Sequence, residues 1–135
     1  MRALVAEDDY TSRVLLQRML SHYGECKVAQ NGARAYELYE AAMKHLEPFD
    51  LICLDIMMPE MDGHEVLHKI RDYEAREAID EQDRAKIMMT TALADISNVR
   101  KAAQGRCDAY LVKPYQREAL LSKLRDMGLI KAQHS

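Results

Sequence analysis

Short apolar runs alternate along the chain with longer amphipathic stretches. The runs occupy residues 3–6, 26–29, 51–54, 87–90 and 109–112. Runs this short suit buried strands better than helices. The stretches between them carry apolar residues at the i, i+3, i+4 spacing of a half-buried helix, as in Ala35, Leu38, Tyr39 and Ala42. Five strands alternating with five helices predict a three-layer α/β fold, a doubly wound parallel sheet with helices on both faces.

Local signals at the helix ends agree with this pattern. We expect Thr11 or Ser12 to cap the first helix and Asn31 to cap the second, since their side chains accept hydrogen bonds from free backbone N–H groups. Glycines fall where three helices should end, at Gly24, Gly105 and Gly128. The charged segment 80–84 is predicted to be a solvated loop or a frayed helix end before the fourth strand.

Composition narrows the class of protein. The 135 residues suit one domain, and 48% apolar with 30% charged residues is typical of a globular chain. No apolar run approaches the roughly 18 residues of a membrane span, and a net charge of −3 offers no broad field for nucleic acid. Three widely spaced cysteines form no zinc pattern, and Cys53 lies in an apolar run, so we expect a reducing, cytoplasmic location.

Polar side chains stand at the ends of four predicted strands. Three acids, residues 7–9, follow the first strand, Asp55 follows the third, Thr90 and Thr91 end the fourth, and Lys113 ends the fifth. In such sheets, ligands bind outside the carboxyl ends of the strands. Several carboxylates in one small space repel one another unless a cation joins them. Oxygen ligands without cysteine or histidine favour Mg²⁺, with Mn²⁺ as the alternative.

Asp55 is the candidate for chemistry at this edge. A carboxylate can attack phosphorus and form an acyl phosphate. Phosphoryl transfer needs positive charge around the phosphoryl oxygens, which a metal ion and the Lys113 ammonium would supply. A threonine hydroxyl would donate a hydrogen bond to a further oxygen. The residues alone therefore indicate phosphoryl chemistry on Asp55.

The chain resembles the receiver domain of bacterial two-component response regulators, of the chemotaxis type. The resemblance rests on segments 4–9, 55–63, 89–92 and 108–114, which include D-x-x-M-P-x-M-D-G and a strand ending in Lys-Pro. It implies a five-stranded (βα)5 sheet in the order 2-1-3-4-5. We expect a receiver domain over residues 1–128 and a short C-terminal tail, 129–135, without an output domain. A stand-alone receiver and a piece of a longer protein both fit this length.

The resemblance also assigns metal ligands. Asp8 would bind Mg²⁺ directly and Glu7 through water, while Asp9 stands just outside the pair. Asp55 would be both the phospho-acceptor and a ligand. Met57 would offer its backbone carbonyl to the metal.

Further roles carry over to the ends of the fourth and fifth strands. Thr91 would be the switch hydroxyl and Lys113 the phosphate-binding lysine, followed by a cis bond to Pro114. Tyr110 would be the aromatic residue that turns inward on activation. Met57 and Leu93 would border the approach of water to the phosphorus, and their apolar side chains predict slow loss of the phosphate.

These assignments predict a phosphorylation-dependent signalling switch and not a metabolic enzyme. It would accept a phosphoryl group from a sensor histidine kinase or a histidine phosphotransfer protein and change its surface at helix four, strand five and helix five. The downstream protein target is unknown, no contact with nucleic acid or membrane is expected, and the chain would be a monomer or a phosphorylation-dependent dimer.

Three other functions fit parts of this sequence. A Mg²⁺-dependent phosphohydrolase with Asp55 as nucleophile is the main alternative, but enzymes of the haloacid dehalogenase type carry a second aspartate where this chain has Met57. A flavodoxin-type cofactor module would need a phosphate-binding loop where residues 7–9 would repel a phosphate. A degenerate, unphosphorylated receiver is disfavoured, because every required side chain is present.

Overall fold

A computed structural model describes residues 1–132 and confirms the predicted architecture. Five parallel strands form one sheet in the order β2-β1-β3-β4-β5. The strands are β1 (Arg2–Ala6), β2 (Glu25–Ala29), β3 (Leu51–Asp55), β4 (Lys86–Ala92) and β5 (Ala109–Lys113). The order places β1 beside β3, so the acids at the ends of these two strands lie at neighbouring positions on one edge of the sheet.

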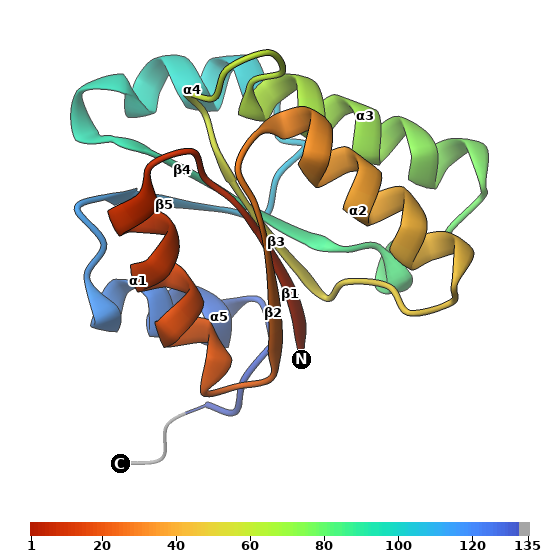
Figure 1. The fold of residues 1–135 in the computed structure, drawn as a ribbon, viewed down its shortest axis with the longest axis horizontal. Helices are drawn as coiled ribbons and strands as arrows, with labels where there is room; N and C mark the ends of the chain where they lie inside the picture. Colours follow the sequence, from red (N-terminus) through yellow and green to blue (C-terminus); the bar gives the residue numbers. More distant parts are fainter. Residues whose placement is uncertain (133–135) are drawn as a thin grey trace.

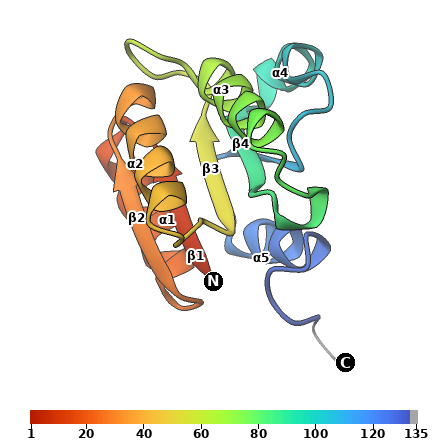
Figure 2. The same cartoon turned by 90° about the vertical axis from the view of Figure 1, so that its right-hand side faces the viewer.

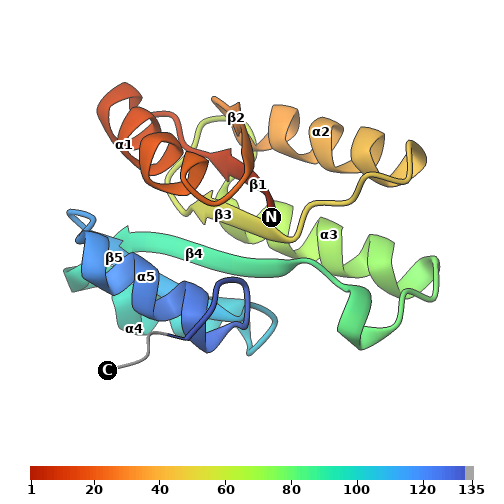
Figure 3. The ribbon, with the colours of Figure 1, turned by 90° about the horizontal axis from the view of Figure 1, so that it is seen from below.

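Helices cover both faces of the sheet, as Figure 1 and the view from below in Figure 3 show. One face carries α1 (Tyr10–Ser21) and α5 (Arg117–Asp126). The other carries α2 (Gly32–Lys44), α3 (Gly63–Arg76) and α4 (Ile96–Ala103), which appear in this order from left to right in Figure 2. None of the described helices has the length and hydropathy of a membrane-spanning helix.

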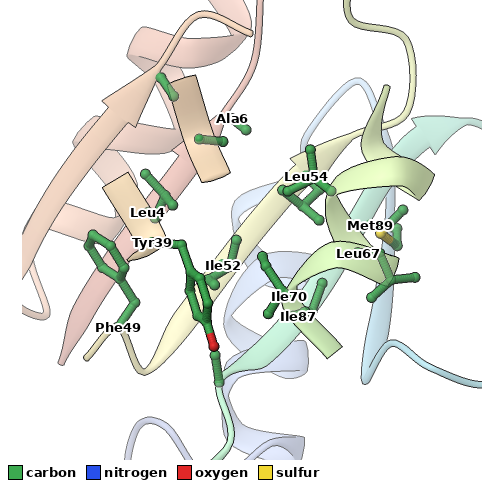
Figure 4. Packing of buried hydrophobic residues seen from close by; sticks show 14 of the residues in the cluster. Leu4, Ala6, Tyr39, Phe49, Ile52, Leu54, Leu67, Ile70, Ile87 and Met89 are labelled. Carbon is green, nitrogen blue, oxygen red and sulfur yellow. The ribbon is translucent and has the colours of Figure 1, made fainter. Parts of the chain in front are cut away.

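The strands are apolar throughout because they are buried on both sides. Leu4, Ile52 and Met89 point towards α2, α3 and α4, where Figure 4 shows them packed with Tyr39 and Ile70. Alternate strand residues instead contact the helices of the opposite face, and these include Ala3, Val5, Cys53, Met88 and Leu111. An apolar cluster therefore packs against each face of the sheet. Cys53 is buried, as predicted.

The prediction for the cap of the first helix was wrong. Asp9 is the N-cap of α1, and its carboxylate accepts the Ser12 N–H at 2.9 Å. The helix begins earlier than expected, so Thr11 and Ser12 lie inside its first turn. Asn31 caps α2 as predicted, through the Arg34 N–H at 2.8 Å. The α1 cap therefore directs the Asp9 carboxylate to the helix end.

Two further boundaries refine the predictions. Strand β4 continues to Ala92, so Thr91 lies within the strand, and the charged segment before it contains a 3-10 turn at Glu81–Asp83. In the predicted tail, Leu129 and Ile130 pack against the cluster under α1 and α5. The last three residues of that tail, 133–135, lie outside the described part of the chain.

A partly buried ion-pair network lies where α3 meets the starts of β4 and β5. The Arg71 guanidinium donates to the carboxylates of Glu74 and Asp108 at 2.7 and 2.9 Å, and to two backbone carbonyls. Glu74 is 1% exposed, and its second oxygen accepts the Ala85 N–H at 2.9 Å. Because every charge has a partner, this network links three elements without leaving an unpaired group.

We expect Glu74→Ala to lower the free energy of unfolding by about 3 kcal/mol or more, since it removes the buried acid of Arg71 and leaves that guanidinium only the exposed Asp108. It also deprives the Ala85 N–H of its acceptor. Urea denaturation measures the change. Glu37→Ala is the matched control, because Glu37 pairs with Arg34 at the same i,i+3 spacing but on an exposed surface. That control should cost less than about 1 kcal/mol. Equal losses in the two variants would contradict a structural role for the network.

Candidate functional site

Three acids from two adjacent strand ends converge at the carboxyl edge of the sheet. Asp55 is the last residue of β3, and Glu7 and Asp8 follow β1. Glu7 and Asp55 are buried, at 0% and 3% exposure, whereas Asp8 is exposed. Each acid offers one oxygen, and these oxygens all lie within 4.8 Å of one another. This donor set fits a hard divalent cation that takes oxygen ligands, such as Mg²⁺.

Lys113, at the end of β5, brings a positive charge to these acids. Its Nζ lies 3.1 Å from Asp55 Oδ2 and 3.1 Å from Glu7 Oε2. The lysine reaches the acids across the end of β4, which lies between β3 and β5. The peptide bond between Lys113 and Pro114 is cis, as expected. One ammonium thus bridges two buried carboxylates that would otherwise repel each other.

The pKa values of Asp55 and Lys113 are both shifted at this edge of the sheet. Burial, together with the neighbouring Glu7 carboxylate, raises the pKa of Asp55 to about 7, although Lys113 acts in the opposite direction. Burial disfavours the charged form of Lys113, but Asp55 and Glu7 outweigh it and raise the pKa of the ammonium. Two acids and one base therefore leave excess negative charge at this edge, which an added cation would relieve.

Asp9 and Met57 border this cluster in different ways. The backbone hydrogen bond from Ser12 is the main cause of the lowered pKa of Asp9, whose carboxylate caps α1. The Asp9 backbone N–H donates to Glu7 Oε1 at 3.2 Å. The Met57 backbone N–H donates to Asp55 Oδ1 at 3.3 Å, and its side chain is 76% exposed. Asp9 therefore contacts the acid cluster through its backbone N–H, while its carboxylate caps α1.

The two predicted switch residues face the same side of the sheet. Thr91 and Tyr110 lie on β4 and β5, where Thr91 pairs with Val112 and Tyr110 with Met89. The buried Thr91 hydroxyl makes one long hydrogen bond, to the Ala92 carbonyl at 3.4 Å. Tyr110 is half-buried, with the Arg100 guanidinium 5.2 Å from its ring centre. Within residues 1–132, neither side chain has a hydrogen-bond partner closer than 3.4 Å.

A cavity of about 500 Å³ adjoins the acids and Thr91. It extends under α4, and its lining includes Asp55, Met57, His64, Thr91 and Val99. His64 Nδ1 is buried there without a hydrogen-bond partner among the described residues. The cavity leaves space beside Thr91 into which side chains can move.

Tyr115 is a site residue that the sequence analysis missed. Its hydroxyl donates to Glu7 Oε2 at 3.0 Å, and the Lys113 Nζ stands 5.9 Å from the centre of its ring. The side chain is 7% exposed. The only signal in the sequence was its place directly after the Lys-Pro pair, which does not reveal the direction of the ring.

Comparison with known proteins gives the family of this chain. The model of the response regulator receiver domain matches residues 3–125. The chemotaxis protein CheY of Bacillus subtilis is 34% identical over 125 residues, which cover 91% of this chain and 93% of that protein. A probable histidine kinase 2 of Oryza sativa is 28% identical, and the match covers 90% of this chain but 12% of that longer protein.

A solved structure extends the likeness to three dimensions. It holds the receiver domain of the Saccharomyces cerevisiae response regulator Ssk1 with the histidine phosphotransfer signaling protein Ypd1. The likeness has a TM-score of 0.82 and 28% identity, and it covers 98% of this chain and 92% of that one. With its acids, lysine and hydroxyl gathered at one sheet edge, the chain belongs to the response regulator receiver domain family.

Proposed function

We propose that the chain is a phosphorylation-dependent signalling switch that accepts a phosphoryl group on Asp55 in a Mg²⁺-dependent reaction. The observation that carries this proposal is the convergence of a buried aspartate, two further acids and a lysine ammonium at 3.1 Å. An aspartate that merely ended a strand would not require two further acids and a lysine beside it. The domain that performs this role spans residues 1–128.

The acids are the proposed metal ligands. Asp8 and Asp55 would bind Mg²⁺, or Mn²⁺, directly, with the Met57 backbone carbonyl as a third protein ligand and Glu7 acting through water. When bound, the ion offsets the negative charge of the acids and of the phosphoryl oxygens. The fit rests on the oxygen-only donor set and on the excess negative charge that Lys113 leaves unbalanced.

The transfer step requires little from the protein beyond position and charge. An oxygen of the ionised Asp55 carboxylate attacks phosphorus of a donor phosphohistidine. The bond from phosphorus to the imidazole nitrogen breaks, and its electron pair stays on that nitrogen. Lys113 and the Thr91 hydroxyl contact the phosphoryl oxygens on Asp55. The product is an aspartyl phosphate that the domain itself forms and slowly loses.

The signal would pass from Asp55 to the surface of α4, β5 and α5. Movement of the Thr91 hydroxyl towards the phosphoryl group would free space beside the cavity, and Tyr110 would turn into it. The long hydrogen bond of Thr91 and the volume under α4 support this step. Phosphorylation would then favour one of two arrangements of this surface, as a population shift requires.

Exposed apolar side chains around Asp55 support a protein donor. Tyr10 and Leu93 are each 70% exposed and Met57 is 76% exposed, on three segments that surround the strand ends. A sensor histidine kinase or a histidine phosphotransfer protein would bind these exposed side chains and so bring its histidine to the buried carboxylate. The chain would act in the cytoplasm, as a monomer or a phosphorylation-dependent dimer, without contacting nucleic acid or membrane.

Asp55→Asn should abolish phosphorylation by acetyl phosphate and Mg²⁺, as detected by mass spectrometry. In wild type the gain of one phosphate should be labile to hydroxylamine. Sustained hydrolysis of the donor by wild type would instead support the phosphohydrolase. Without metal, the variant should unfold at the same or a higher temperature than wild type. Ionisation of Asp55 costs folding energy as pH rises from its unfolded pKa of about 4 to about 7, so the gain should grow across that range.

Asp8→Ala should remove the thermal stabilisation that Mg²⁺ provides, since binding to the folded state stabilises it by mass action. Asp9→Ala is the control, because the Asp9 carboxylate caps α1. Asp9→Ala should lower stability by about 1 kcal/mol at every Mg²⁺ concentration. A larger loss of Mg²⁺ stabilisation in Asp9→Ala than in Asp8→Ala would move the ligand assignment by one residue.

The phosphoryl group on Asp55 should decay more slowly in wild type than in a Met57→Asn, Leu93→Glu double variant. The apolar Met57 and Leu93 side chains cannot orient a water by hydrogen bonding, whereas the substituted polar groups can. The measurement is the loss of phosphorylated protein in Mg²⁺ after removal of the donor. Equal rates, or faster decay in wild type, would show that these side chains do not limit hydrolysis.

A further inference from the structure

Glu7 is the most deeply buried acid of the site, with 0% exposure. A buried carboxylate is costly unless donors surround it. Three groups donate to Glu7 in the described structure. They are the Lys113 ammonium at 3.1 and 3.2 Å, the Asp9 backbone N–H at 3.2 Å and the Tyr115 hydroxyl at 3.0 Å.

These three donors differ in what else they must do. Lys113 also contacts Asp55 at 3.1 Å, and in the proposed function its ammonium contacts the phosphoryl group on that residue. The Asp9 N–H belongs to the backbone at the start of α1 and approaches one oxygen only. Tyr115 is therefore the side-chain donor that serves Glu7 alone among the acids of the site.

Tyr115 is also firmly placed. Its ring is 7% exposed and packs in the cluster under α1 and α5 with Leu111, Leu120 and Leu124. Burial raises the pKa of its hydroxyl, which therefore stays protonated and can act as a donor. A rigid aromatic ring loses little conformational freedom when it holds a second group. It is suited to fix a longer and more flexible acid.

We propose that Tyr115 is a positioning residue for the metal centre, whose hydroxyl holds Oε2 of Glu7 and thereby fixes the carboxylate in the orientation from which Glu7 would act on the metal through water. This inference rests on the proposed function, because it deepens the role assigned there to Glu7. A glutamate has one more rotatable bond than an aspartate, so its carboxylate needs an anchor to keep one orientation. Groups that orient a ligand in this way typically change metal affinity by about tenfold or more.

The test is Tyr115→Phe, which removes the hydroxyl and keeps the ring. Mg²⁺ titration without a phosphodonor, followed by the NMR shifts of the Asp8 and Met57 amides, should show a dissociation constant about tenfold higher than in wild type. Tyr39→Phe is the matched control. Its hydroxyl is equally buried and has no hydrogen-bond partner among residues 1–132, so its removal should leave the affinity for Mg²⁺ unchanged.

The same substitution in a Glu7→Asp background separates positioning from packing. An aspartate is one methylene shorter and does not reach the Tyr115 hydroxyl, so adding Tyr115→Phe should then change the Mg²⁺ dissociation constant by less than about twofold. Equal affinities in wild type and Tyr115→Phe, or a tenfold loss that persists with Glu7→Asp, would overturn the inference.

Its failure is distinguishable from that of the proposed function. Tyr115-dependent Mg²⁺ binding in a wild-type protein that takes no phosphate on Asp55 would refute the function and leave the inference standing. Phosphorylation of Asp55 with Mg²⁺ binding that ignores Tyr115 would do the reverse. A wild-type protein that binds no Mg²⁺ would refute both.

Discussion

The site depends on one electrostatic constraint, the confinement of two buried carboxylates beside a single ammonium. Glu7 and Asp55 are both buried at the carboxyl edge of the sheet, and Lys113 contacts each at 3.1 Å. One positive charge cannot neutralise both acids and Asp8 as well, so negative charge remains. Burial raises the pKa of Asp55, and the neighbouring Glu7 carboxylate raises it further. A divalent cation would offset the remaining negative charge.

The fold brings these groups together through its strand order. Because β1 lies beside β3, the acids at the ends of these strands lie close together, and the long lysine side chain reaches them from β5 across β4. The same edge opens onto the cavity under α4 and carries the weakly held Thr91. A change of charge on Asp55 therefore acts on a part of the structure that has room to move. Phosphoryl acceptance and surface change would share one set of residues.

The polar network of Arg71, Glu74 and Asp108 is organised differently. There the buried guanidinium has acids and carbonyls for partners, and Glu74 also accepts a backbone N–H. Its second acid, Asp108, is exposed to solvent and also accepts the Ile87 N–H, so each charge is satisfied without a further ion, which suits a structural role. At the carboxyl edge of the sheet, two buried acids share one ammonium and the pKa of Asp55 is raised, and such perturbed groups are typical of sites that bind or react. The two clusters therefore differ in the burial of their acids, because both acids beside Lys113 are buried, whereas one of the two acids beside Arg71 is exposed.

The sequence by itself determined the alternation of strands and helices, because strands covered on both faces must be apolar throughout and helices on a sheet must be apolar on one face. It also placed the acids, Thr91 and Lys113 at strand ends, and the resemblance to receivers supplied the strand order and the roles. The structure confirmed that order. Local patterns were enough to predict the strands and helices, because the apolar spacing of each element involves residues that are close together in the sequence.

Only the tertiary structure decided which donors surround each acid. Asp9 caps α1 instead of Thr11 or Ser12, since the helix begins at Tyr10, directly after the acids, and the Asp9 carboxylate accepts the Ser12 N–H. Tyr115 meets Glu7 from 108 positions away in the sequence, through a ring direction set by packing under α5. Such contacts depend on how side chains fill the space between distant segments, and no periodicity along the chain records that.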